Sequence, residues 1–221
     1  MSQAKAEALA PIVHRAAVIP VLTIEDARQS IPLARTLVDA GLPVLEVTLR
    51  TPAALDAIAA MAKAVPEAVI GAGTVVATSQ IAEAIEAGAR FIVTPGTTDK
   101  LARALAEAPV PALPGCATVS EAMALADCGF EVLKFFPAAP SGGPAWLKAV
   151  AGPLPNLRFC PTGGLDADSA SAYLALPNVV CVGGAWMAPA ADIGRGAFDR
   201  IAELARRAAQ LRVGAAAPAT A

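Results

Sequence analysis

Lys134 is the residue whose surroundings most need a chemical explanation. It interrupts an otherwise apolar, strand-like run at residues 131–137. Burying a charged amine without a partner costs several kcal/mol, and loss of the proton relieves that cost. A neutral amine is also the form that attacks a carbonyl carbon to give a Schiff base. The ordinary alternative is a lysine whose stem packs on apolar surface while its ammonium group reaches water.

A carboxylate and a guanidinium group fall together on another predicted strand. Glu46, Thr48 and Arg50 occupy alternate positions along residues 43–50. Alternate side chains of a strand point to the same face, so these groups share one side of the sheet. On that side Glu46 can move protons and Arg50 can bind an anion. The alternative is an ion pair at the rim whose two members only satisfy each other.

Glycine-rich segments follow three of the predicted strands. Thr74 comes after Gly71-Ala72-Gly73, where its hydroxyl could bind a carboxylate or cap the next helix. Gly163-Gly164 follows the seventh predicted strand and Gly183-Gly184 follows the eighth. In parallel barrels, the loops after these two strands form a recurrent phosphate site from backbone N–H groups. Two glycine pairs at both positions predict a phosphorylated ligand.

The elements that must position these groups alternate regularly along the chain. Eight short apolar strands are predicted at residues 17–22, 43–49, 68–73, 90–94, 110–115, 131–136, 157–161 and 179–182. Helices are predicted at residues 24–40, 52–65, 79–87, 98–106, 119–128, 144–151, 167–175 and 195–211. Eight strand–helix units favour an α/β fold, a (β/α)₈ TIM barrel, over an open doubly wound sheet. Glycines at the ends of several of these helices are the expected stop signals.

The domain organisation follows from the absence of any linker-like segment. We expect an N-terminal helical extension at residues 1–16, one catalytic barrel domain at 17–212, and a flexible tail at 213–221. A chain of 221 residues is an ordinary length for one barrel.

Composition excludes several classes of partner. The net charge of -2 argues against nucleic acid, which requires a basic face. No apolar stretch is long enough to span a membrane and no signal peptide is evident, so we expect a cytoplasmic protein. The four cysteines are scattered and His14 is the only histidine, which argues against a zinc site. We therefore expect reduced cysteines and no metal.

Seven short motifs, in this order, resemble the 2-keto-3-deoxy-6-phosphogluconate (KDPG) and 4-hydroxy-2-oxoglutarate (KHG) aldolase family. The resemblance covers about residues 18–189, most of the chain. The motifs are IPV at 19–21, LEVTLRT at 45–51, GAGT at 71–74, VTPG at 93–96, LKFFPA at 133–138, FCPTGG at 159–164 and VGGAW at 182–186. Singly several are weak, but together they are highly specific.

This resemblance implies a class I aldolase that forms a Schiff base, needs no cofactor or metal, and assembles as a homotrimer. Its substrate would be a small keto-acid phosphate, KDPG, cleaved to pyruvate and glyceraldehyde 3-phosphate, with KHG as a second substrate cleaved to pyruvate and glyoxylate. The implied roles are Schiff-base lysine for Lys134, general acid/base for Glu46, carboxylate binding for Arg50 and Thr74, pocket lining for Pro95 and Phe136, and phosphate binding for Thr162, Gly163, Gly164, Gly183 and Gly184.

One departure from the family pattern concerns the phosphate. Ala185 stands where the family often has serine, so one hydroxyl donor is missing. The loss of such a hydrogen bond weakens binding by roughly 0.5–1.5 kcal/mol, or up to about 3 for a charged acceptor. The choice among the phosphorylated gluconate, its galactonate epimer and the unphosphorylated hydroxy-oxoglutarate therefore stays open.

Two other functions fit the same elements. A sugar-phosphate isomerase or epimerase could use the double glycine site but has no need of a nucleophilic lysine. A non-catalytic phosphate-binding barrel would bind its ligand without turnover and would tolerate Lys134→Met. Only the aldolase uses Lys134, Glu46 and Arg50 together.

Overall fold

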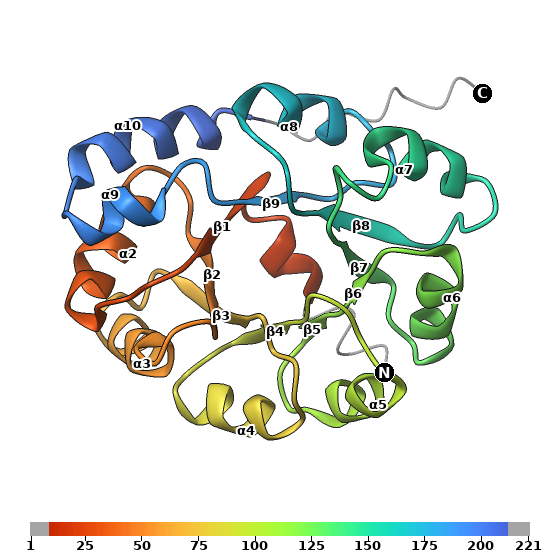
Figure 1. Cartoon of the computed structure of the whole chain (residues 1–221), viewed down its shortest axis with the longest axis horizontal. Helices are drawn as coiled ribbons and strands as arrows, with labels where there is room; N and C mark the ends of the chain where they lie inside the picture. Colours follow the sequence, from red (N-terminus) through yellow and green to blue (C-terminus); the bar gives the residue numbers. More distant parts are fainter. Residues whose placement is uncertain (1–8, 212–221) are drawn as a thin grey trace.

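The computed structural model describes residues 9–211, in which short parallel strands alternate with helices (Figure 1). The strands are β1 (Val18–Leu22), β2 (Val44–Thr48), β3 (Val69–Gly73), β4 (Phe91–Val93), β5 (Ala112–Leu113), β6 (Gly115–Cys116), β7 (Val132–Phe135), β8 (Arg158–Pro161) and β9 (Val182–Gly184). The helices are η1 (Ala27–Gln29), α2 (Ser30–Asp39), α3 (Ala54–Ala64), α4 (Ser79–Glu86), α5 (Asp99–Glu107), α6 (Val119–Asp127), α7 (Gly143–Ala151), α8 (Ala167–Leu174), α9 (Ala190–Gly194) and α10 (Phe198–Ala209). Residues 9–13 are also helical.

The strands form two parallel sheets. One has six strands in the order β5-β4-β3-β2-β1-β9, and the other has three in the order β6-β7-β8. Isolated parallel bridges, Phe159 with Val179 and Thr162 with Gly183, connect the β8 side to the β9 side. Figure 1 shows the strands around a common centre with the helices outside them. The prediction of a parallel α/β fold is confirmed.

The fifth predicted strand, residues 110–115, is divided into β5 and β6. Pro114 lies between them and has no backbone N–H to give to a ladder. β5 pairs with β4, whereas β6 pairs with β7, so the two sheets meet at this proline. The sequence prediction of one uninterrupted strand here is wrong for that reason.

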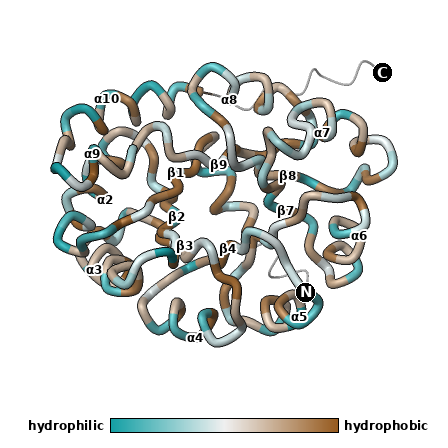
Figure 2. Tube along the Cα trace, in the orientation of Figure 1, coloured by the Kyte–Doolittle hydropathy of each residue, from teal (hydrophilic) through white to brown (hydrophobic). Residues whose placement is uncertain are grey.

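Side chains on both faces of the strands are buried, in two separate cores. Leu45 and Ile70 belong to the outer core between strands and helices, while their neighbours Val44 and Val69 belong to the inner core. This alternation explains why the strands are apolar at nearly every position. In Figure 2 brown, hydrophobic segments lie on the central strands, and the surrounding helices are mixed teal and brown.

The helical residues 9–13 close one end of the inner core. Leu9 and Val13 are 1% exposed and belong to the same cluster as Val44 and Val69, which begin their strands. The helix therefore lies at the amino ends of the strands, opposite the end where polar side chains gather. The predictions for residues 1–8 and for the tail at 213–221 concern residues outside the described range.

Helix ends follow the predicted stop signals at three positions. Gly41, Gly88 and Gly129 come just after α2, α4 and α6 with φ of +94°, +101° and +85°. Glycine adopts this left-handed conformation without a Cβ penalty. The predicted helix 195–211 is observed as α10 but begins three residues later, after Gly196 at φ +68°, whereas the short helix α9 before it was not predicted.

The last strand lies further along the chain than the predicted residues 179–182. β9 continues its pairing with β1 through Ile19 with Gly183 and Pro20 with Gly184. The second glycine pair is therefore part of a strand and does not follow it. No helix within residues 9–211 is both long and apolar enough to cross a membrane.

Candidate active site

A buried ion pair occupies the carboxyl-terminal side of the strands. Lys134 on β7 donates from Nζ to Glu46 Oε1 at 2.9 Å and to Oε2 at 3.3 Å. The side chains are 5% and 3% exposed. The amine that the sequence placed in an apolar run thus has a carboxylate partner 88 residues away. Glu46 is close enough to exchange a proton with Nζ directly.

Two neighbours define the space around this pair. A Cβ added to Gly73 would overlap Oε1 of Glu46, so only glycine at the end of β3 leaves room for the carboxylate. On the other side, Nζ of Lys134 lies 5.5 Å from the centre of the Phe136 ring. A cation at this distance from an aromatic face is attracted by the ring.

Arg50 and Thr74 meet just above the ion pair. Arg50 donates from Nε to Thr74 Oγ1 at 3.0 Å. Thr74 has φ of +57° and is the one non-glycine residue with positive φ among residues 9–211. Such backbone strain persists only where the surrounding structure enforces it, and it clusters at functional sites. The backbone of Thr74 therefore holds its hydroxyl next to the Arg50 guanidinium.

A cavity of about 460 Å³ opens over Lys134. Its volume falls in the range of small-molecule sites. It is lined by Val21, Arg50, Lys134, Phe136, Thr162, Gly163, Gly164, Leu165, Gly184, Ala185, Trp186 and Pro189. Seven of the sequence-predicted residues thus share one cavity.

The remaining four predicted residues do not line this cavity. Glu46 bonds Lys134 and Thr74 bonds Arg50, as described above. Gly183 lies against Thr162, where an added Cβ would overlap Oγ1. Pro95 is not among the described residues that line the cavity; its carbonyl packs against Gly115.

The glycine pairs bring backbone close to the cavity. Gly163 and Gly164 have φ of +97° and +76°. A Cβ at Gly164 would lie 2.7 Å from Cβ of Ala139, and one at Gly184 would overlap the Trp186 ring. Side chains are thus excluded from the places where a ligand can approach main-chain atoms. Ala185 presents a methyl group in the same wall.

Leu165, Trp186 and Pro189 form an apolar wall of the cavity that was not predicted from the sequence. Trp186 was visible only as the end of a motif, and the other two carried no chemical signal. Thr94 and Thr97, to which no role was assigned from the sequence, both join hydrogen bonds between the two sheets.

Cysteines are the other nucleophilic side chains near the strands, and two of them, Cys116 and Cys181, have raised thiol pKa values. Burial raises the pKa of Cys116 to about 12, with a further contribution from the Glu121 carboxylate. A hydrogen bond with Cys160, followed by burial, raises the pKa of Cys181 well above its ordinary value. The thiolate is the reactive form of cysteine. Lys134 is therefore the better candidate nucleophile.

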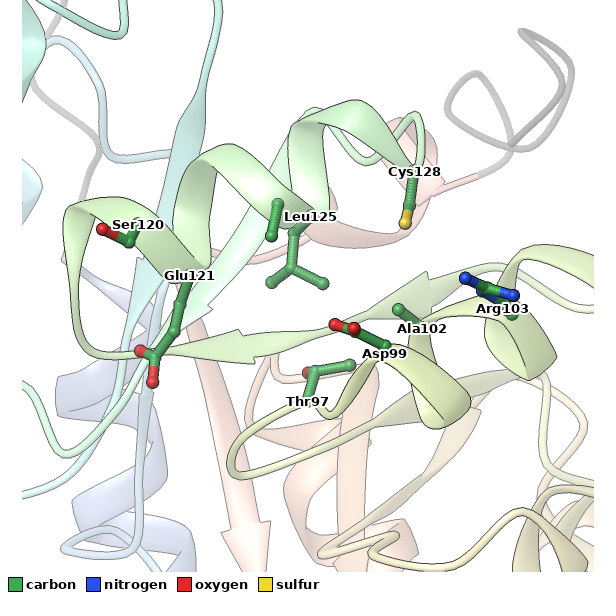
Figure 3. Close-up of a pocket in the computed structure, with 9 residues that line it drawn as sticks. Thr97, Asp99, Ala102, Arg103, Ser120, Glu121, Leu125 and Cys128 are labelled. Carbon is green, nitrogen blue, oxygen red and sulfur yellow. The ribbon is translucent and has the colours of Figure 1, made fainter.

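A second hollow, of about 300 Å³, lies between α5 and α6 on the outer surface (Figure 3). Its polar groups include Asp99, Arg103 and Glu121. The Glu121 carboxylate already accepts hydrogen bonds from the backbone N–H groups of Ala117 and Thr118. None of the sequence-predicted site residues lines this hollow, so we do not assign the chemistry to it. Across residues 9–211, no three or more His, Cys, Asp or Glu side chains group in a way that could hold a metal ion.

The sequence is similar to that of known aldolases. The family model described as "KDPG and KHG aldolase" matches residues 9–204. The KHG/KDPG aldolase of Escherichia coli (strain K12) is 49% identical over 193 residues, which are 87% of this chain and 91% of that protein. The 2-dehydro-3-deoxy-phosphogluconate aldolase of Pseudomonas aeruginosa is 47% identical over 195 residues, 88% of this chain and 89% of the relative.

Solved structures similar to this chain are also KDPG aldolases. The KDPG aldolase of Legionella pneumophila, with pyruvate captured as a covalent carbinolamine intermediate, superposes with a TM-score of 0.89 at 41% identity, covering 91% of this chain and 98% of that one. The 2-keto-3-deoxy-6-phosphogluconate aldolase of Zymomonas mobilis ZM4, solved with 3-phosphoglycerate, gives 0.87 at 44% identity, covering 94% and 97%.

Proposed function

The chain belongs to the KDPG and KHG aldolase family, and we propose that it is a class I aldolase that cleaves KDPG to pyruvate and glyceraldehyde 3-phosphate. The observation that carries this proposal is the buried pair of Lys134 and Glu46, 2.9 Å apart beneath a cavity of ligand size. An amine and a proton carrier in contact are the two groups that Schiff-base chemistry requires.

Lys134 supplies the nucleophile. A carbinolamine forms when Nζ attacks the ketone carbon of the substrate, and loss of water gives an iminium ion. Glu46 takes the proton that leaves the amine, because its carboxylate already contacts Nζ, and gives it to the carbinolamine hydroxyl that departs as water. The positively charged iminium then draws electrons from the adjacent carbon–carbon bond.

Glu46 acts in both of the following steps, first as a base in bond cleavage and then as an acid before product release. Glu46 accepts the proton of the hydroxyl whose carbon becomes the aldehyde, and the electrons of the broken bond form a neutral enamine. After glyceraldehyde 3-phosphate leaves, Glu46 returns a proton to the enamine carbon. Water then hydrolyses the iminium and frees pyruvate and Lys134.

Arg50 and Thr74 bind the pyruvyl carboxylate in this proposal. Their mutual hydrogen bond places a guanidinium and a hydroxyl together at the edge of the cavity. A guanidinium pairs with a carboxylate through two parallel hydrogen bonds, which a lysine at position 50 could not reproduce. Phe136 forms the side of the pocket around the keto group, and no contact with substrate is proposed for Pro95, which does not line the cavity.

The phosphate lies at the opposite end, among Thr162, Gly163, Gly164, Gly183 and Gly184. Close approach of backbone at the two glycine pairs supports this assignment. Because Ala185 offers no hydroxyl, we expect phosphate to contribute less to binding than it would with serine at this position. KHG, which lacks the phosphate, is therefore proposed as a second substrate, cleaved to pyruvate and glyoxylate.

The test is a direct measurement of pyruvate release from purified protein. KDPG, its galactonate epimer and KHG are supplied separately, and pyruvate is followed by its reduction with lactate dehydrogenase. We expect release from KDPG, and none from any substrate with Lys134→Met. Isomerisation or epimerisation of a sugar phosphate without pyruvate release would contradict the proposal.

Four further features belong to the same proposal. We propose that the two sheets form one closed eight-stranded barrel, in which β5 and β6 count as a single strand interrupted at Pro114; the bridges between β8 and β9 support closure at the other junction. We further propose a single catalytic domain at residues 17–212, preceded by a helical extension. A homotrimer and a cytoplasmic location are proposed from the family resemblance.

A further inference from the structure

The junction between the two sheets is held by side chains where backbone pairing stops. Pro114 separates β5 from β6, so the ladder that begins between β4 and β5 does not continue to Gly115. Gly115 N–H instead donates to Thr94 Oγ1 at 2.9 Å, and Thr97 Oγ1 donates to Gly115 O at 3.0 Å. Two threonine hydroxyls thus take the place of a neighbouring strand.

These contacts form a ring with one possible direction. Oγ1 of Thr94 and Oγ1 of Thr97 are 2.8 Å apart. The hydroxyl proton of Thr97 is already given to the Gly115 carbonyl, so Thr94 must donate to Thr97. Thr94 in turn accepts from Gly115 N–H. Each donor finds an acceptor, and removing either hydroxyl breaks the whole ring. We call these three residues the Thr94–Thr97–Gly115 ring.

The ring contacts the strand next to the one that carries Lys134, the proposed nucleophile. Gly115 is the Cα partner of Lys134 in the pairing of β6 with β7, and Lys134 N–H donates to the Pro114 carbonyl at 2.9 Å. A Cβ on Gly115 would overlap the carbonyl group of Pro95, so the loop after β4 packs closely against the same residue. Thr94 is fully buried, whereas Thr97 also lines the outer hollow between α5 and α6 (Figure 3).

We propose that Thr94 and Thr97 are positioning residues for Lys134: by fixing Gly115 between the two sheets, they fix the strand from which the amine reaches Glu46. This inference rests on the proposed role of Lys134 as the nucleophile. Neither hydroxyl lines the cavity over Lys134, so both act through Gly115 and not on the substrate. Small displacements of a reacting group have large kinetic effects, of about 10²-fold for 1 Å.

The test replaces each hydroxyl by a methyl group of similar size. For Thr94→Val and Thr97→Val we expect kcat to fall about tenfold or more and the rate of borohydride-trapped pyruvate adduct formation to fall in parallel. KM should change less than about twofold, because Arg50 and Thr74 are carried by other strands. Thr94→Ser keeps the hydroxyl and should restore most of the lost kcat.

A matched control separates this role from a general effect of losing a threonine hydroxyl. Thr36 also donates to a backbone carbonyl, that of Pro32 at 2.9 Å, but on the exposed side of α2. Thr36→Val should leave kcat unchanged. Because the ring acts as a unit, the double variant of Thr94 and Thr97 should be about as slow as the slower single variant. If Thr94→Val does not fold, Thr97→Val, at a half-buried position, decides the question.

The outcomes are distinct for the two proposals. If wild-type protein forms the Lys134 adduct but both valine variants keep wild-type kcat and trapping rate in folded protein, the positioning role is contradicted while the aldolase proposal stands. Lower melting temperatures with unchanged kcat would have the same meaning. Absence of an adduct in wild-type protein would overturn both proposals.

Discussion

Lys134 and Glu46 are each almost entirely removed from water, and each is the other's partner in a buried ion pair. Breaking a buried ion pair by deleting one partner costs about 3–5 kcal/mol, because an uncompensated charge remains. Lys134→Ala therefore tests stability as well as chemistry. A double variant, Lys134→Met with Glu46→Gln, removes both charges and should be more stable than Lys134→Met alone. It is the better inactive control for ligand binding.

Glu46→Gln separates the two halves of the proposed mechanism. Glutamine has nearly the same shape and can still accept a hydrogen bond from Nζ, but it cannot carry a proton. Loss of a general acid/base lowers turnover by about 10²- to 10⁴-fold. We therefore expect kcat for KDPG to fall by that factor while pyruvate is still trapped on Lys134 by borohydride. Wild-type turnover in this variant would assign proton transfer to another group.

At the scale of the strand, glycine decides whether the carboxylate fits. Gly73 ends β3 against Glu46, and an added Cβ would overlap the carboxylate oxygen that bonds Lys134. Gly73→Ala should displace Glu46 and lower kcat about tenfold or more. The control is Gly152→Ala, since Gly152 has ordinary negative φ and no atom near the added Cβ. Equal activity of the two variants would show that the position of Glu46 tolerates movement.

Some of the site residues could be predicted from the sequence, but the contacts between them could not. Lys134 could be selected because a charge in an apolar run is rare, and Arg50 because alternation along a strand is a local rule. The contact of Lys134 with Glu46 joins residues 88 positions apart, and no local pattern gives its distance. Strand and helix types were therefore predictable, whereas the contacts that complete the site depend on tertiary packing.

The differences from prediction have specific physical origins. Pro114 divides a predicted strand because it lacks an N–H, a signal that was present in the sequence but not used. Gly183 and Gly184 lie inside β9 because pairing with β1 continues through them, although glycine usually marks a strand end. The role of Thr94 could not be predicted, since it depends on which backbone group lacks a partner after folding.

For the whole molecule, the N-terminal helix and the active site lie at opposite ends of the strands. Leu9 fills the inner core beside the first residues of β2 and β3. Leu9→Ala should lower the free energy of unfolding by about 2–5 kcal/mol through lost burial and a cavity. Activity at a temperature where the variant is folded should match wild type. Urea unfolding together with kcat/KM checks both, and a parallel loss of activity would show that the helix also shapes the site.

The raised pKa of the buried Cys116 thiol makes the free energy of unfolding depend on pH in the alkaline range. The pKa of Cys116 is about 12, against 9.0 for an unperturbed thiol, so the folded protein holds this proton more tightly than the unfolded chain. Its stabilising effect is complete below pH 9.0 and is lost as the pH rises toward 12. The loss by about pH 10 is on the order of 1 kcal/mol.

The measurement is the free energy of unfolding of wild type and Cys116→Ala at several pH values between about 8 and 11. Wild type should lose more stability with rising pH than the variant, whatever the difference between them at neutral pH. Equal slopes would mean that Cys116 ionises with the same pKa in the folded and unfolded protein. The other buried thiols are present in both proteins and cancel in the comparison.

Reductive trapping with pyruvate shows whether Lys134 forms the covalent bond to substrate. The protein is incubated with pyruvate and sodium borohydride, digested, and mapped by mass spectrometry. We predict one pyruvate adduct, confined to the peptide that contains Lys134 and absent from Lys134→Met. No adduct on folded wild-type protein, or an adduct on another lysine, would contradict the account.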